Sequence, residues 1–184
     1  MKKMITLGIS ASSAVWKMCD LIERFRKNEQ FEIDVHVIMT ENATKFISPL
    51  MFQTLTQNEV SVNVAQEHEP EKINHIFLAQ SSDVFLIAPA TSNTIGKIAH
   101  GMADNMLTSV AQAVPKGTPK LFAPAMNDVM YHQEIVQENI DKLKKRGYKE
   151  IKPREDRLSS GKIAIGALAE VEAIEKEVLD FLLM

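Results

Sequence analysis

The stretch Asp83-Val84-Phe85-Leu86-Ile87-Ala88-Pro89 is a continuous apolar run between an aspartate and a proline. A run of this kind predicts a strand buried on both faces, because a strand with one exposed face alternates apolar and polar residues. Proline lacks a backbone donor, so we expect the strand to stop there. Small polar residues follow at 90–94, and a helical pattern then runs to Gly101. The stretch therefore predicts one strand, loop and helix unit.

Similar units recur along the chain. Apolar runs predict further strands, and helical patterns separate them, with the runs at residues 4–9, 31–39, 120–122 and 148–151. Alternating strands and helices favour a mostly parallel sheet with helices on both faces. We therefore expect an α/β fold that is Rossmann-like (flavodoxin-like). A chain of 184 residues can bury one sizeable core, so we expect a single domain spanning residues 1–184.

Composition and charge argue against several classes of protein. The apolar fraction is 45% and the formal net charge is -3, so no overall positive field attracts nucleic acid. No apolar run approaches the roughly 20 residues of a membrane helix, and no signal sequence precedes the first strand. We expect a cytoplasmic protein without nucleic-acid or membrane partners. Cys19 is the single cysteine, which excludes an intrachain disulfide and a four-cysteine zinc site. We expect Cys19 to be a small core residue, and we expect no metal.

Small polar residues follow the predicted strands. Residues 10–13 precede a helical pattern whose apolar positions are Trp16, Cys19, Leu21, Ile22 and Phe25. Backbone amides and serine hydroxyls at such a helix start can bind a phosphate. A serine that caps the helix explains the same residues, and the glycines of the dinucleotide fingerprint are absent. Both interpretations remain open from the residues alone.

Asn127 follows another predicted strand that ends at Pro124. Strand ends of open α/β sheets face a crevice, and a carboxamide there can donate to one group and accept from another. This chemistry suits a carboxylate or a flavin carbonyl. Capping of the next helix is an equally good explanation of Asn127.

Two further segments carry weaker signals. His75 lies in the first turn of the helix predicted at 74–79, where histidines are usually exposed or capping residues. Residues 153–168 have no sustained period and contain two glycines, so we expect a long loop. Long loops in compact domains often serve as lids, although surface disorder is the alternative.

Several of these stretches together resemble the homo-oligomeric flavin-containing cysteine decarboxylases. The similarity runs nearly end to end. The family's Pro-x-Met-Asn-x-x-Met pattern is met at residues 124–130, with Tyr131 where the family usually has tryptophan. Asn-His-Ile at 74–76 is similar to the stretch that holds the family's active-site histidine. Pro-Ala-Thr-Ser-Asn-Thr at 89–94 resembles its flavin loop, and Lys97, Asp104 and Asn105 also fall into the pattern.

The resemblance implies bound FMN and a trimer whose flavin sites are shared between subunits. It implies that His75 is the base near the substrate thiol and that Asn127 binds the carboxylate that leaves. The expected substrate contacts are Asn127, Met130 and Ala167. The expected FMN contacts are Ala11, Ser12, Ser13, Thr40, Thr91, Ser92, Asn93 and Thr94. A trimer would give the methionine-rich segment 102–114 an interface to bury.

The chemistry of the family explains these residue types. A cysteine carboxylate has no electron sink, and oxidation of the CH2-SH group to a thioaldehyde by flavin creates one. In the coenzyme A branch, a cysteine in a Leu-Ala-Cys-Gly stretch then donates the proton that allows reduction of the enethiolate. The matching residues are Leu158-Ser159-Ser160-Gly161, so Ser160 occupies the cysteine position. A thiol has a pKa of about 8.5, and a hydroxyl is a far weaker acid. Lys162 and Ala164 also replace the usual aspartate and glycine.

Three functions are consistent with this resemblance. The first is decarboxylation of 4'-phosphopantothenoylcysteine, favoured by stretches such as 166–170 and 120–130. The second is oxidative decarboxylation of a peptidyl C-terminal cysteine that stops at the enethiol, as in the lantibiotic branch, whose lid lacks the cysteine. The third is a flavin-binding regulatory subunit without catalysis.

Overall fold

The computed structural model describes residues 2–65 and 73–183. A parallel sheet has the strand order β2-β1-β3-β4-β5. Its strands are β1 (Lys2–Ile9), β2 (Glu32–Met39), β3 (Val84–Ala90), β4 (Lys120–Pro124) and β5 (Tyr148–Glu150). This order is that of the flavodoxin-like fold, so the predicted fold class is confirmed.

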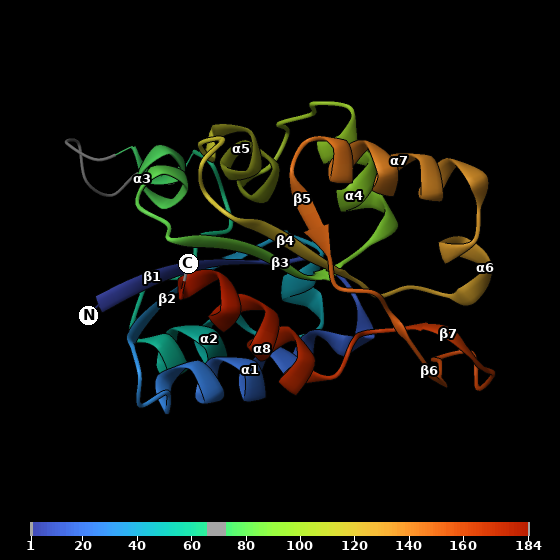
Figure 1. Cartoon of the computed structure of the whole chain (residues 1–184), viewed down its shortest axis with the longest axis horizontal. Coiled ribbons are helices and arrows are strands. Elements are labelled where there is room, and N and C mark those ends of the chain that lie inside the picture. The colour runs from blue at the N-terminus through green and yellow to red at the C-terminus, as the bar shows by residue number, and fades with distance from the viewer. Residues whose placement is uncertain (1, 66–72, 184) are drawn as a thin grey trace.

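Helices cover both faces of the sheet (Figure 1). One face packs against α1 (Lys17–Arg26), α2 (Pro49–Thr56) and α8 (Val171–Leu182). The other packs against α3 (Asn74–Gln80), α4 (Ser92–Ala99), α5 (Met106–Ala113) and α7 (Glu134–Lys145). All residues of β3 and β4 are buried, as their continuous apolar sequences predict. The described chain also has short helical turns η1 (Ser13–Trp16), η2 (Ala43–Lys45) and α6 (Asp128–Tyr131).

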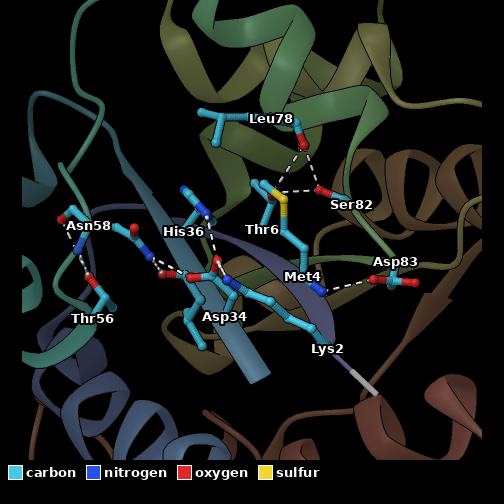
Figure 2. Close-up of polar contacts among 11 residues, drawn as sticks. Lys2, Met4, Thr6, Asp34, His36, Thr56, Asn58, Leu78, Ser82 and Asp83 are labelled. Atoms are coloured by element: carbon cyan, nitrogen blue, oxygen red, sulfur yellow. Dashed lines mark hydrogen bonds and ion pairs between the residues drawn. The ribbon is translucent and has the colours of Figure 1, made fainter. Parts of the chain in front are cut away.

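Polar contacts fasten the amino-terminal part of β1 to its neighbours (Figure 2). Thr6 is fully buried, and its hydroxyl donates to the Leu78 carbonyl oxygen of α3 at 3.0 Å. Met4 donates its backbone N–H to Asp83 just before β3 at 2.8 Å. Lys2 forms a 3.1 Å ion pair with Asp34 of β2. Since buried polar groups are costly unless paired, these contacts favour the observed neighbours of β1.

The prediction of a long loop at residues 153–168 is wrong. These residues form an antiparallel hairpin of β6 (Arg154–Arg157) and β7 (Ile163–Ala167) beside the main sheet. Ile163 and Ile165 are 64% and 43% exposed, so no buried face imposes a periodic apolar pattern on the hairpin. Backbone hydrogen bonds between the two strands hold the hairpin instead. Such bonds do not require particular side chains, so the sequence pattern does not reveal them.

Three smaller expectations also change. Trp16 is 64% exposed and contributes nothing to the core stripe assigned to it, while Cys19 packs partly buried against the core. Strand β3 continues through Pro89 to Ala90, with a shift of register against β4 after Ile87. Met106 and Val110 of α5 are buried within the chain's own core, whereas Met102 is 47% exposed, so an interface for segment 102–114 stays a prediction for its exposed part.

Candidate active site

The buried hydroxyl of Ser10 connects two loops at the carboxyl edge of the sheet. It donates to the Pro89 carbonyl oxygen at 2.7 Å and accepts from the Thr91 backbone N–H at 2.9 Å. Ser10 is 1% exposed, so water does not compete for these bonds. The loop after β1 is therefore held against the loop after β3.

Both loops begin helical turns with capping hydroxyls. Ser12 Oγ accepts from the Ala14 N–H at 3.3 Å, and Thr91 Oγ1 accepts from the Thr94 N–H at 3.4 Å. The capping interpretation is therefore correct for Ser12, and Thr91 caps α4 in the same way. A hydroxyl that accepts one bond retains its own proton for donation, as at Ser12. The Thr91 hydroxyl donates to Thr94 Oγ1 at 3.3 Å, a long bond that a ligand oxygen can replace. Capping and anion binding are thus compatible at these positions.

A cavity of about 690 Å³ lies at this edge of the sheet. It brings together residues from the β1, β3 and β4 loops and from the β6–β7 hairpin. Among its lining residues are Ala11, Ser12, Ser13, Trp16, Lys17, Phe46, Thr91, Met126, Asn127, Met130, Arg157, Leu158, Ser159, Ser160, Ala167 and Leu168. The predicted site residues Ala11, Ser12, Ser13, Thr91, Asn127, Met130, Ser160 and Ala167 all belong to this set.

Other predicted site residues do not line this cavity. Thr40 Oγ1 accepts from the Ala43 N–H at 3.2 Å and caps the turn after β2. Ser92, Asn93 and Thr94 form the first turn of α4, where Thr94 is buried. His75 lies in α3, which Figure 1 shows at the opposite end of the molecule's long axis from the hairpin. One chain therefore does not unite His75 with Asn127.

Asn127 caps α6 and still presents a donor. Its Oδ1 accepts from the Val129 N–H at 2.9 Å. The amide plane is thereby oriented, and its Nδ2 has no hydrogen-bond partner among the residues that the structure describes. Nδ2 can therefore donate to a ligand oxygen in the cavity while Oδ1 maintains the cap.

Three contacts join the hairpin to the walls of the cavity. Gly166 accepts a 2.9 Å bond from the Met126 N–H. The hydroxyls of Ser13 and Ser159 lie 2.8 Å apart. The Lys162 ammonium pairs with Asp128, and this bond holds the pKa of the Asp128 carboxyl below its ordinary value. The hairpin therefore lies over the cavity as a lid, with Ser160 in its turn.

The sequence interpretation missed several features of the site. Trp16 and Phe46 line the cavity although both are mostly exposed, and an apolar pattern alone does not distinguish them from core residues. The Lys162–Asp128 pair joins residues 34 positions apart, which no local pattern reveals. A useful signal was present at Lys162 itself, since it departs from the family's usual aspartate.

The lining residues fit a flavin mononucleotide. Ser12, Ser13 and Thr91 supply hydroxyl donors at helix starts, which suit a phosphate or ribityl oxygens. Met126, Met130 and Phe46 supply apolar surface for a flat ring. Among residues 2–65 and 73–183, no group of three His, Cys, Asp or Glu side chains is arranged to hold a metal ion. Within the same residues, no helix is long and apolar enough to cross a membrane.

The sheet order and the lidded cavity at its carboxyl edge define a cofactor-binding α/β protein of the flavodoxin-like class. The chain belongs to the Flavoprotein family, whose sequence model matches residues 1–183.

Two curated relatives illustrate the sequence similarity. A probable phosphopantothenoylcysteine decarboxylase of Streptococcus mutans is 47% identical over 178 residues, which is 97% of this chain and 98% of the relative. The coenzyme A biosynthesis bifunctional protein CoaBC of Bacillus subtilis is 42% identical over 172 residues. That match covers 94% of this chain and 41% of the bifunctional protein, so the chain corresponds to a part of it.

Two solved structures share the whole fold. A cysteine-to-serine mutant of PPC decarboxylase, complexed with pantothenoylaminoethenethiol, aligns with a TM-score of 0.87 and 29% identity over 100% of both chains. The FMN-dependent cysteine decarboxylase SpaF aligns with a TM-score of 0.83 and 25% identity, covering 98% of this chain and 97% of that one.

Replacement of Gly166 by alanine should displace the lid. A Cβ at this position would lie 2.3 Å from the Met126 carbonyl oxygen, and the three nearest atoms are all backbone of residues 126–128, so no flexible side chain can move aside. We expect Gly166→Ala to lower the free energy of unfolding by about 1–3 kcal/mol and to accelerate amide exchange in residues 154–167. Gly117→Ala is the matched control, since a Cβ at that position would meet nothing within 4 Å. Equal exchange rates in the two variants would contradict the close-approach argument.

Amide exchange in the hairpin should also depend on pH through Asp128. Its pKa is lowered in the folded state, so the pair contributes above the ordinary carboxyl value of about 3.9 and is lost as pH falls through the lowered value. We expect Asp128→Asn to reduce hairpin protection at pH 7, and we expect this difference to shrink as the pH falls below about 3.9, after correction for intrinsic rates. Asp180→Asn, which breaks an exposed pair on α8, serves as control. A pH-independent effect of Asp128→Asn would exclude the ion pair as its cause.

Proposed function

We propose that this chain is an FMN-dependent decarboxylase that converts 4'-phosphopantothenoylcysteine to 4'-phosphopantetheine in coenzyme A biosynthesis. The observation that carries the proposal is the cavity where Asn127 meets the hydroxyl-bearing loops beneath the hairpin. The names of the Streptococcus mutans and Bacillus subtilis relatives support the substrate and the pathway. A cytoplasmic location belongs to the same proposal.

Different residues of the cavity would bind the cofactor, orient the carboxylate and contact the rest of the substrate. Bound FMN supplies a two-electron oxidant for the CH2-SH group, which gives the carboxylate an electron sink. Asn127 Nδ2 donates to the carboxylate, and its orientation is set by the bond from Val129 to Oδ1. Such positioning contributes several kcal/mol toward lowering the barrier. Ser12, Ser13 and Thr91 would hold the cofactor through their hydroxyls, and Met130 and Ala167 would contact the substrate.

His75 enters the proposal through a second copy of the chain. It lies on α3, away from the cavity that contains Asn127 in the same chain. We assign it as the base that assists thiol ionisation in a neighbouring subunit's cavity, since an imidazole nitrogen can accept the thiol proton. Phe46, Leu50 and Met51 are 59%, 64% and 47% exposed, and they offer apolar surface for a homotrimer.

Ser160 favours a second candidate function. The residue lines the cavity in the hairpin turn, but its hydroxyl is a far weaker proton donor than a thiol. The enethiolate left by decarboxylation would then be released without reduction. A peptidyl C-terminal cysteine is the alternative substrate for such a reaction.

Product masses distinguish the candidate reactions. Incubation of the flavin-loaded protein with phosphopantothenoylcysteine should yield a product that has lost CO2 if both half-reactions occur. Loss of CO2 and two hydrogens would indicate release at the enethiol. In that case Ser160→Cys should shift the product to loss of CO2 alone, whereas Ser81→Cys, at an exposed position after α3, should not. Unchanged substrate with bound FMN would overturn the proposal and favour a regulatory role.

Mixed subunits test the shared site. His75→Gln and Asn127→Ala should each abolish turnover when purified alone. If every site takes His75 from one chain and Asn127 from another, random mixing restores about a quarter of the sites. The measurement is decarboxylation after the two variants are unfolded and refolded together. Activity no higher than that of either variant would show that the two residues do not act across subunits.

A further inference from the structure

We propose that the Asp128–Lys162 ion pair is a positioning pair, which sets the place of Ser160 relative to Asn127 during the second half of the reaction. The proposal rests on the decarboxylase function above and concerns the same cavity. Neither residue is assigned to contact the substrate. Their role is to connect the two segments that do.

The ion pair joins the segment that holds Asn127 to the segment that holds Ser160, at positions next to or near these two residues. Asp128 directly follows Asn127 and is the first residue of α6, where its side chain is only 12% exposed. Lys162 stands two residues after Ser160, at the exit of the turn formed by residues 158–161. Its ammonium donates to Asp128 Oδ2. Movement of Lys162 away from Asp128 therefore also moves Ser160 away from Asn127.

Besides the buried side chain of Leu158, few contacts restrain the tip of the hairpin. The bond between Gly166 and Met126 holds the base of β7, and the Ser13–Ser159 hydroxyl pair is exposed to competing water. The side chains of Ile163 and Ile165 face solvent, so apolar burial does not hold this strand down. Within residues 2–65 and 73–183, Lys162–Asp128 is the ion pair that connects the hairpin to α6. The pair therefore controls the tip more than the base.

Arg154 and His132, two neighbouring basic residues, bind other groups and not the Asp128 carboxylate. Arg154, the other cation of the hairpin with an ion pair, is engaged by Asp156 and Glu170. His132 contacts the backbone carbonyl of Asp128, not its carboxylate. An ion pair with one exposed partner contributes little to global stability, so its removal should leave the fold intact. The effect should instead appear in the alignment of the cavity.

Loss of the ion pair should affect the two half-reactions differently. Carboxylate binding depends on Asn127, whose cap is internal to α6 and does not involve the hairpin. Proton delivery to the carbon of the enethiolate depends on the side chain at position 160. A displaced hairpin should therefore spare CO2 loss and impair reduction.

The test measures how the product divides between enethiol and reduced thiol. The background is Ser160→Cys, in which the proposed donor is a thiol. In the flavin-loaded protein with phosphopantothenoylcysteine, adding Asp128→Asn or Lys162→Gln should raise the enethiol-to-thiol ratio about tenfold or more, since small misplacements reduce rates strongly. Lys162→Arg retains a cation and should leave the ratio unchanged. Lys176→Gln breaks the exposed pair with Asp180 on α8 and is the matched control.

The outcomes separate this inference from the proposed function. Without any decarboxylated product in the Ser160→Cys background, the proposed function fails. If products form but the ratio stays constant across all the variants, the positioning role is wrong. An equal fall in both products would likewise overturn it and indicate general damage to the site. Reversal of the pair by Asp128→Lys with Lys162→Asp should restore the ratio, which a purely structural role of either residue would not predict.

Discussion

All five strands of the main sheet run in the same direction, and this constraint positions everything else in the site. Parallel strands end at a common edge, so loops from distant parts of the sequence meet there. The first loop, the loop after Pro89 and the segment around Asn127 become neighbours without any sequence proximity. Ser10 then fastens two of these loops with bonds of 2.7 and 2.9 Å. The site is thus a consequence of strand direction, refined by a buried hydroxyl.

The same topology separates His75 from the cavity. The chain passes from β2, at one edge of the sheet, through α3 to the central strand β3, and α3 packs over α5. The hairpin leaves from β5 at the opposite edge. Figure 1 shows the resulting separation of α3 and the hairpin along the molecule. This separation is the observation behind the proposal that His75 acts in the cavity of a second copy of the chain.

Most of the sheet could be predicted from the sequence, because strands buried on both faces require continuous apolar residues. The loops at its carboxyl edge carry a similarly local signal, since small residues and prolines stand where strands end. The hairpin could not be predicted, because its stability comes from backbone bonds and from contacts at Gly166. The Lys162–Asp128 pair could not be predicted either, because a contact between residues 34 positions apart is known only once the fold is known. Trp16 shows the opposite error, where helical spacing predicted burial for an exposed residue.

The position of the lid matters more for a serine than for a cysteine. A thiol with a pKa of about 8.5 can protonate an enethiolate when the hairpin holds it in place. A hydroxyl has far less driving force for the same transfer, so any contribution from Ser160 requires close and sustained alignment. The chain combines this weak donor with an ion pair between Lys162, beside the hairpin turn, and Asp128, which follows Asn127. Under the proposed mechanism, CO2 loss depends on Asn127 at the sheet edge and on His75 of a neighbouring subunit, whereas proton delivery to the enethiolate depends on the hairpin.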